Sequence, residues 1–275
     1  MRWSAWGSVP LVVVAAYACS DFEATDTAPA SDGGDAGDAE DAGSDATPAA
    51  DGSSDAPMAP FCEIDGGTIC EDFDDPQSSR FPLPYTTDGG TITIVDDPHY
   101  SPPKALRATY SPIDAGGCNY AIIESATLGA PAPNGFHAEY KVRLAKLSGI
   151  ANIGARIYMA AADGGRNCDY YVWVTPTGAS LHVGNNQGDS DDHALGERPI
   201  VGQWSHLTID VHGAAGAQKV EVTVDDKVAL VDTAVRPECA FDTALRTVEV
   251  GLHCVDETVA GDLDIAVDDV RVIVR

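Results

Sequence analysis

Basic side chains are scarce in this chain. It holds 16 lysine and arginine residues against 43 aspartate and glutamate residues, for a formal net charge of -27. Nucleic acid needs lysine and arginine to neutralise its phosphates, so the charge balance excludes it as a partner. Anionic lipid headgroups would be repelled for the same reason.

The usual catalytic and metal-binding motifs are missing as well. No Cys-x-x-Cys spacing occurs, which disfavours a zinc site or a thioredoxin-like site. There is no G-x-S-x-G, P-loop, dinucleotide fingerprint or H-E-x-x-H. The seven histidines are scattered, and His206 and His212 lie on one strand face but about 20 Å apart, too far to share a metal. None of the common enzyme signatures is therefore present.

The first residues have the order of features of an export signal. Arg2 is the only basic residue before Arg80, and the apolar stretch 9–16 is too short to span a bilayer. Small residues follow, so we predict a signal peptide over 1–18. Two cleavage patterns fit: the simple Ala-x-Ala rule, and a bacterial lipobox ending in Cys19, although Ala16 stands where that pattern prefers leucine.

Cysteine number favours the lipobox. Seven cysteines are an odd number for an exported protein, and lipidation of Cys19 would leave six to pair in an oxidising compartment. Ser20, rather than an aspartate, follows Cys19, which in the usual bacterial sorting pattern is compatible with transfer to the outer membrane. We therefore expect an outer-membrane or cell-surface lipoprotein, held to the membrane through its N-terminal lipid only. A periplasmic or secreted protein is the alternative.

Residues 19–60 contain almost no large apolar side chains. From Asp21 to Pro60 there are eleven acidic residues and no basic ones. Such a segment buries too little surface to offset its ordering entropy, and its like charges extend it. We expect a disordered tether.

Period-two alternation dominates from Phe61 onward. Apolar and polar residues alternate over 136–144, 207–212 and 220–225, and no stretch shows a sustained helical period. Glycine, proline, asparagine and aspartate separate the runs. About a dozen short strands, each with one apolar face, predict an all-β domain over 61–275: a two-sheet antiparallel jelly-roll sandwich.

Four segments of this domain resemble the concanavalin A-like lectin/glucanase superfamily, the laminin-G-like jelly rolls. Residues 202–211 (GQWSHLTIDV) resemble its G-x-W strand. Residues 220–228 (VEVTVDDKV) resemble the hairpin that follows, with Asp226 where glycine is usual. Residues 265–272 (IAVDDVRV) resemble the closing strand, and 71–75 (EDFDD) the opening edge strand. The resemblance implies a core position for Trp204.

Glycoside hydrolases occur in this superfamily, and they need two carboxylates flanking the scissile bond. The resemblance would supply them from an E-x-D-x-E strand. No such triplet exists here. Residues 262–264 alternate two aspartates but add no third acid. We therefore expect no catalytic residues.

The resemblance also implies a structural calcium between the first and last strands. Calcium takes six to eight oxygen ligands. The acidic residues at the matching ends of the domain are Glu71, Asp72, Asp268 and Asp269. The alternative is that they are solvated acids in an acidic protein.

Aromatic side chains beside amides form the best candidate for carbohydrate binding. Tyr171 and Trp173 share one face of a strand, Tyr170 shares the other with Val172, and one of these faces must be core. The candidate residues are Tyr170, Tyr171, Trp173, His182, Asn185 and Asn186.

The leading hypothesis is a non-catalytic module, tethered to the cell envelope, that binds extracellular or cell-wall polysaccharide. A structural or protein-interaction domain without a glycan ligand is the first alternative. A polysaccharide hydrolase or lyase is the third hypothesis.

Six cysteines allow fifteen pairings, and proximity in sequence is the only guide. We expect Cys62–Cys70, which flank a glycine-containing turn, together with Cys239–Cys254 and Cys118–Cys168.

Replacing Cys19 with serine tests the lipid anchor. Stable anchoring takes more than one hydrocarbon chain, and lipidation of this cysteine would supply two or three. The variant should move from the membrane fraction to the soluble fraction on cell fractionation. Unchanged membrane association would contradict lipidation.

Overall fold

The computed structural model describes residues 61–63, 68–75, 79–111, 119–161, 167–185, 190–214, 216–236, 239, 243–255 and 261–275. All of them belong to one compact unit, Ala56–Arg275. The predictions for the signal peptide, Cys19 and the tether lie outside the described residues. Within the described part of the chain, no helix is long and apolar enough to cross a membrane.

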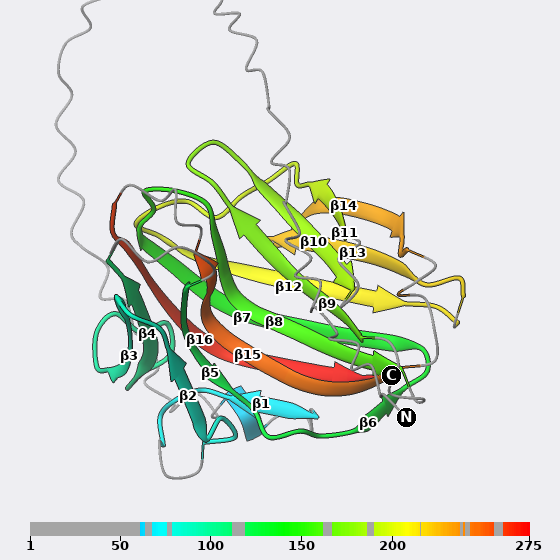
Figure 1. The fold of residues 1–275 in the computed structure, drawn as a ribbon, viewed down its shortest axis with the longest axis horizontal. Coiled ribbons are helices and arrows are strands. Elements are labelled where there is room, and N and C mark those ends of the chain that lie inside the picture. Colours follow the sequence, from blue (N-terminus) through cyan, green and yellow to red (C-terminus); the bar gives the residue numbers. More distant parts are fainter. Residues whose placement is uncertain are drawn as a thin grey trace, which may run out of the picture. The chain divides into compact units, whose positions relative to one another are not determined.

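Two antiparallel sheets form a sandwich, as the alternation predicted (Figure 1). A short 3-10 helix, η1 (Phe61–Glu63), precedes them. Over the described residues each sheet has eight strands. Sheet A has the order β14 (Lys227–Ala234), β13 (Lys219–Val224), β12 (Trp204–His212), β7 (Gly135–Lys146), β16 (Leu263–Val274), β4 (Ala105–Tyr110) and β3 (Gly90–Val95), and β1 (Ile69–Glu71) also pairs with β16. Sheet B has the order β11 (Ser190–Ala194), β10 (Ala179–Asn185), β9 (Asn167–Val174), β8 (Ala151–Ala161), β15 (Thr243–Val255), β5 (Asn119–Glu124) and β2 (Leu83–Thr86), and β6 (Ala130–Ala132) also pairs with β15.

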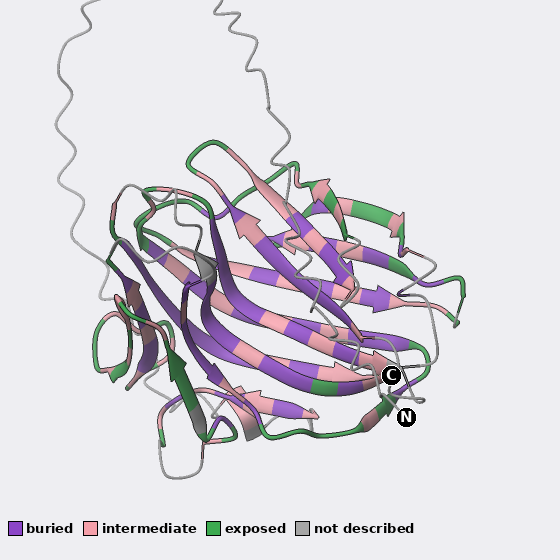
Figure 2. Ribbon diagram, viewed as in Figure 1, coloured by how far each residue is buried: buried purple, intermediate pink, exposed green. Residues whose placement is uncertain are grey.

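The core lies between the sheets, and period-two alternation sends every second side chain into it. Strand β12 shows the pattern most simply: Leu207, Ile209 and Val211 are fully buried, whereas the residues between them are half-buried on the other face. Alternating bands of buried and half-buried residues along the central strands are visible in Figure 2. Edge strand β14 is largely exposed. The fold thus gives each sheet one core face and one outer face.

Trp204 is not a core residue, which corrects the expectation from the resemblance. It occupies the outer face of sheet A, half-buried, with its ring centroid 6.0 Å from that of Tyr100 in an edge-to-face contact. The neighbouring Ser205 takes the core side of the strand. Because successive side chains of a strand point to opposite faces, Trp204 lies on the outer face when Ser205 lies on the core face.

The predicted disulfides are right in one case and wrong in two. Cys62 and Cys70 are bonded, with their Cα atoms 5.5 Å apart. Cys168 pairs with Cys239, at a Cα–Cα distance of 5.6 Å, and not with Cys118. The expected Cys239–Cys254 bridge is excluded by the same bond. Strand β9 brings Cys168 to a residue 71 positions away, a closure that sequence proximity does not indicate.

Gly154 tests the packing between the sheets. Its φ is +80°, and a Cβ atom there would lie 2.2 Å from Cε2 of Tyr140, a fully buried side chain of sheet A. Gly154→Ala should lower the free energy of unfolding by about 2–4 kcal/mol, from overpacking and left-handed strain. Denaturant unfolding measures the change.

Gly178→Ala is the matched control. A Cβ atom there would meet one side-chain oxygen at 3.8 Å, an ordinary contact. Equal stability of the Gly154→Ala variant and this control would contradict the close approach of the two sheets at Tyr140.

Candidate functional site

The outer face of sheet B gathers charged and aromatic side chains from five neighbouring strands. Strand register aligns three of them in one row: Glu124 of β5 lies opposite Glu249 of β15, and Glu249 lies opposite Arg156 of β8. The core-facing residues on either side of Glu249 are Val248 and Val250, both fully buried. Burial of the valines therefore forces Glu249 outward, and the same alternation acts on the other strands.

Arg156 is the centre of the charged network. Its Nε and Nη2 atoms donate to Asp169 Oδ2 at 2.8 and 2.5 Å, and its Nη1 donates to Glu249 Oε2 at 3.2 Å. The guanidinium carbon lies 5.4 Å from the ring centroid of Tyr158 and 5.5 Å from that of Tyr171. One cation thus holds two carboxylates and two rings in place.

His253 lies behind Glu249 on the same strand and is fully buried. Its Nδ1 is 3.0 Å from Glu249 Oε2, yet the contact lacks the alignment of a regular hydrogen bond. Burial lowers the pKa of His253, because the imidazolium loses its hydration, although the negative Glu249 opposes the change. Burial alone would raise the pKa of Glu249, but His253 and the charge of Arg156 outweigh it and hold that pKa below its ordinary value. Glu249 is therefore ionised at neutral pH.

Glu124 has the opposite electrostatic setting. Burial raises its pKa, and the negative charge of its neighbour Glu249 raises it further, while Arg246 acts against both. Like charges directly opposite each other in a sheet destabilise it. The two glutamates line a polar cavity of about 330 Å³, together with Arg156, Tyr158 and Arg246 among others. The pair is thus two carboxyl groups of unequal acidity in one cavity.

An aromatic cluster adjoins this charged row on β9 and β10. The rings of Tyr171 and His182 are stacked, with centroids 4.4 Å apart, and Trp173 meets Tyr171 edge-on at 5.4 Å. His182 Nδ1 lies 2.8 Å from Asp192 Oδ1. Tyr171 is buried, whereas Trp173 is half-buried. Trp173 therefore leaves more of its ring open to a ligand than Tyr171 does.

Three of the six carbohydrate candidates named from the sequence come together here: Tyr171, Trp173 and His182. Tyr170 does not, because it faces the core, with its ring centroid 5.2 Å from that of Phe136. Asn185 lies at the end of β10 on the face of the core residues Leu181 and Val183, opposite to His182. Asn186 lies outside the described residues.

The candidate calcium ligands of the closing strand occupy a bulge of β16. Asp268 is fully buried, and its carboxylate accepts hydrogen bonds from the backbone N–H groups of Tyr100, Ser101 and Asp269 at 2.9–3.0 Å. Burial, and then the charge of Asp269, raise the pKa of Asp268 to about 7. Asp269 accepts a hydrogen bond from the Ser101 hydroxyl at 2.7 Å. These donors are N–H and O–H groups, which suit a carboxylate without a cation.

The two candidates of the opening segment are likewise engaged by backbone groups. Glu71 accepts from the N–H groups of Phe73 and Arg80 at 3.1 and 2.8 Å, and Asp72 accepts from that of Asp74 at 3.2 Å. Among the described residues, no three His, Cys, Asp or Glu side chains are placed to hold one ion. Calcium binding stays a prediction.

Sequence reasoning missed Arg156, Glu124 and Glu249. Each is a single charged residue in an alternating strand, and only pairing of β5, β15 and β8 brings them into one row. A search for acids on one strand, as in E-x-D-x-E, cannot detect carboxylates that come from two strands.

Solved structures with the same fold are found, although no protein-family model and no curated protein matches the sequence. An endo-β-1,4-glucuronan lyase of the fungus Trichoderma reesei has a TM-score of 0.59 and 13% identity, over 76% of this chain and 96% of that one. A carbohydrate esterase of the Shiga toxin-encoding bacteriophage phi24B has a TM-score of 0.53 and 15% identity, over 76% and 99%. The cellulose-induced protein Cip1 has a TM-score of 0.50 and 13% identity, over 74% and 96%. At these identities the similarity shows the fold, a jelly-roll sandwich.

Arg156→Met tests the charged network. Removal of the cation leaves the carboxylates of Asp169 and Glu249 unpaired in a partly buried site, which should lower the free energy of unfolding by about 3 kcal/mol. Wild type should lose stability as the pH falls below 4.5 through the lowered pKa of Glu249. The variant should show less of that acid-side loss, because its Glu249 keeps only the part of the pKa lowering that comes from His253.

Lys146→Met is the control for this measurement, made by denaturant unfolding across pH. Lys146 pairs with Asp262 at 3.5 Å, and the two side chains are 60% and 51% exposed. Loss of an exposed pair should cost about 1 kcal/mol or less. Equal losses in the two variants would contradict a central role for Arg156.

Proposed function

We propose that the outer face of sheet B binds an extended polysaccharide. The observation that carries the proposal is the half-buried Trp173, whose ring contacts Tyr171. Tyr171 in turn contacts Arg156, which lines a polar cavity of about 330 Å³ on the same face. Aromatic rings cover the apolar faces of sugars, and nearby charged and amide groups pair with hydroxyls. The fold shared with a glucuronan lyase, a carbohydrate esterase and a cellulose-induced protein supports this class of ligand.

A neutral polysaccharide fits the charges better than an acidic one. The guanidinium of Arg156 is already paired with Asp169 and Glu249. From Phe61 onward, the chain has 32 acidic residues against 15 basic ones, so an anionic chain would meet net repulsion. Polar pairing with hydrated sugars barely exceeds its desolvation cost, so affinity should be micromolar to millimolar, about -4 to -8 kcal/mol.

The predicted export signal and acidic tether would put this binding face in a setting of cell-wall and extracellular polysaccharide. A lipid on Cys19 would hold the domain at the envelope, and the tether would separate it from the membrane. In the rival hypothesis the domain is a structural or protein-interaction module without a glycan ligand. A glycan array on the purified chain distinguishes the two.

Trp173→Ala tests the binding face. Loss of the ring should weaken binding of neutral β-glucans at least tenfold, because the sugar loses its apolar contact surface. Calorimetric titration measures the affinity. Trp204→Ala is the matched control, since Trp204 is also half-buried but lies on the outer face of sheet A. If no neutral glycan binds wild type at millimolar concentration, the structural-module hypothesis is the better one.

Glycosidic-bond hydrolysis is a second candidate function, favoured by the pairing of Glu124 with Glu249. Cross-strand partners have Cβ atoms about 4.5–5.5 Å apart. Two glutamates so placed can bring their carboxyl groups to the separation of about 5–5.5 Å that a retaining glycosidase uses. The unequal pKa values assign the roles: Glu124, with the raised pKa, is the acid, and Glu249, with the lowered pKa, is the nucleophile.

In this mechanism the Glu249 carboxylate attacks the anomeric carbon and forms a glycosyl ester. Glu124 donates its proton to the leaving oxygen as the glycosidic bond breaks. The Glu124 carboxylate, now ionised, then removes a proton from water. The water oxygen attacks the anomeric carbon and releases Glu249. Both contacts of Glu249, from Arg156 and from His253, are made to Oε2, so neither occupies Oε1.

Reducing-end assays across neutral β-glucans test hydrolysis. Turnover by wild type, lost at least a hundredfold in Glu124→Gln and Glu249→Gln, would support it. Glu221→Gln, on the outer face of sheet A, should leave turnover unchanged. Absence of turnover with every glycan that binds would reject the catalytic candidate and leave the binding function standing. Products with a new carbon–carbon double bond would indicate a lyase instead.

A further inference from the structure

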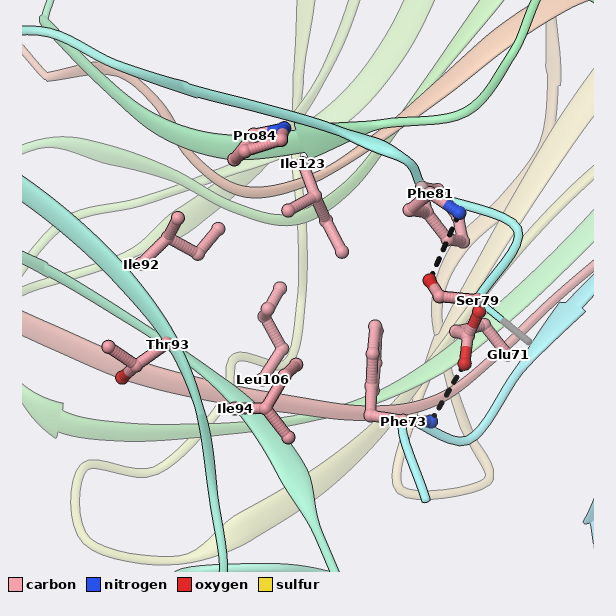
Figure 3. A pocket seen from close by; sticks show the side chains of 10 residues that line it. All are labelled: Glu71, Phe73, Ser79, Phe81, Pro84, Ile92, Thr93, Ile94, Leu106 and Ile123. Atoms are coloured by element: carbon pink, nitrogen blue, oxygen red, sulfur yellow. Dashed lines mark hydrogen bonds between the residues drawn. The ribbon is translucent and has the colours of Figure 1, made fainter. Parts of the chain in front are cut away.

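A second cavity, of about 220 Å³, lies between the two sheets at the end formed by β2, β3, β4 and β5. Figure 3 shows its walls: Ile92 from β3, Leu106 from β4 and Ile123 from β5 turn toward a common space, and Phe81 closes one side. Strands β3 and β4 belong to sheet A, and β2 and β5 to sheet B. The cavity is thus a gap in the sandwich core at one edge.

The cavity deepens from an exposed rim to a buried floor. Phe73 and Leu106 in the floor are each 1% exposed. At the rim, Pro84, Thr93 and Ile94 are exposed. A molecule could therefore enter from solvent between β2 and β3 and come to rest against core side chains.

Glu71 and Ser79, which lie deeper in the wall than the exposed Thr93, already accept hydrogen bonds. The two carboxylate oxygens of Glu71 accept hydrogen bonds from the N–H groups of Phe73 and Arg80, and Ser79 Oγ accepts one from the N–H of Phe81 at 3.1 Å. A polar ligand atom at the floor would lose its water without gaining a partner. An anionic group would in addition meet the buried carboxylate of Glu71. The walls therefore select an uncharged, apolar occupant.

The volume sets the size of the occupant. A buried apolar cavity of about 150 Å³ takes up benzene. A volume of about 220 Å³ admits one aromatic ring with a short alkyl substituent. We propose that this cavity is a binding site for a small, uncharged apolar molecule of that size.

This site is independent of the polysaccharide face. Ile123 faces the cavity, whereas the next residue of β5, Glu124, lines the polar cavity on the outer face of sheet B. A ligand in one cavity therefore contacts a different face of the strand from a ligand in the other. Failure of one proposal leaves the other untouched.

Toluene is the probe for the test, with benzoate as its charged counterpart. The purified full chain should bind toluene saturably, with methyl NMR shifts at Ile92, Leu106 and Ile123 and a thermal unfolding midpoint that rises with toluene concentration. Benzoate should cause neither change. No saturable toluene binding, or equal binding of benzoate, would overturn the proposal.

Ile92→Phe tests whether toluene binds in this cavity. The partly buried Ile92 lines the cavity, and a larger side chain there would fill it. The substitution should weaken toluene binding at least tenfold. Val231→Phe, which enlarges a side chain 69% exposed on β14, should bind toluene as wild type does. If near-UV circular dichroism shows that Ile92→Phe is not folded, Ile94→Trp at the exposed rim serves the same purpose. Wild-type affinity in a folded cavity-filling variant would place toluene elsewhere and reject the site.

Discussion

Strand register around β15 is the constraint on which the candidate site depends. This strand pairs with β5 on one side and β8 on the other, and its Val248 and Val250 are buried between the sheets. A shift of one residue would expose the valines and bury the charges, so the core energy holds the register. That register puts Glu124, Glu249 and Arg156 in one row. Packing of the core side chains thus determines where the charged side chains of the outer face lie.

The charged side chains of this row contribute little to the stability of the fold. Two glutamates directly opposite each other repel, and a partly buried ion pair such as Arg156–Glu249 recovers little more than its desolvation cost. Unequal pKa values and convergent polar groups in one cavity are features of functional sites, which supports the proposed binding or catalytic role.

The two cavities differ in the physical chemistry of their walls. The one on the outer face of sheet B is lined by charged and hydroxyl groups and suits a hydrated ligand such as a sugar. The one between the sheets is lined mainly by apolar side chains, and the Glu71 and Ser79 oxygens in its wall already accept hydrogen bonds from backbone N–H groups. Their difference follows from position: an outer face keeps polar side chains, whereas a gap between sheets is bounded by core residues.

The sequence by itself determined the all-β sandwich and most strand positions, because period-two alternation is a local property of a half-buried strand. It also determined that Tyr171 and Trp173 share a face, although not which face is outside. Only the tertiary structure decided that Tyr170 is core, that Trp204 is not, and that Cys168 pairs with Cys239. The charged row is the plainest case: Arg156 and Glu249 are 93 residues apart, and no local pattern encodes which strands become neighbours. Pairing between distant strands depends on how both sheets pack together, and the sequence of a single segment does not show this.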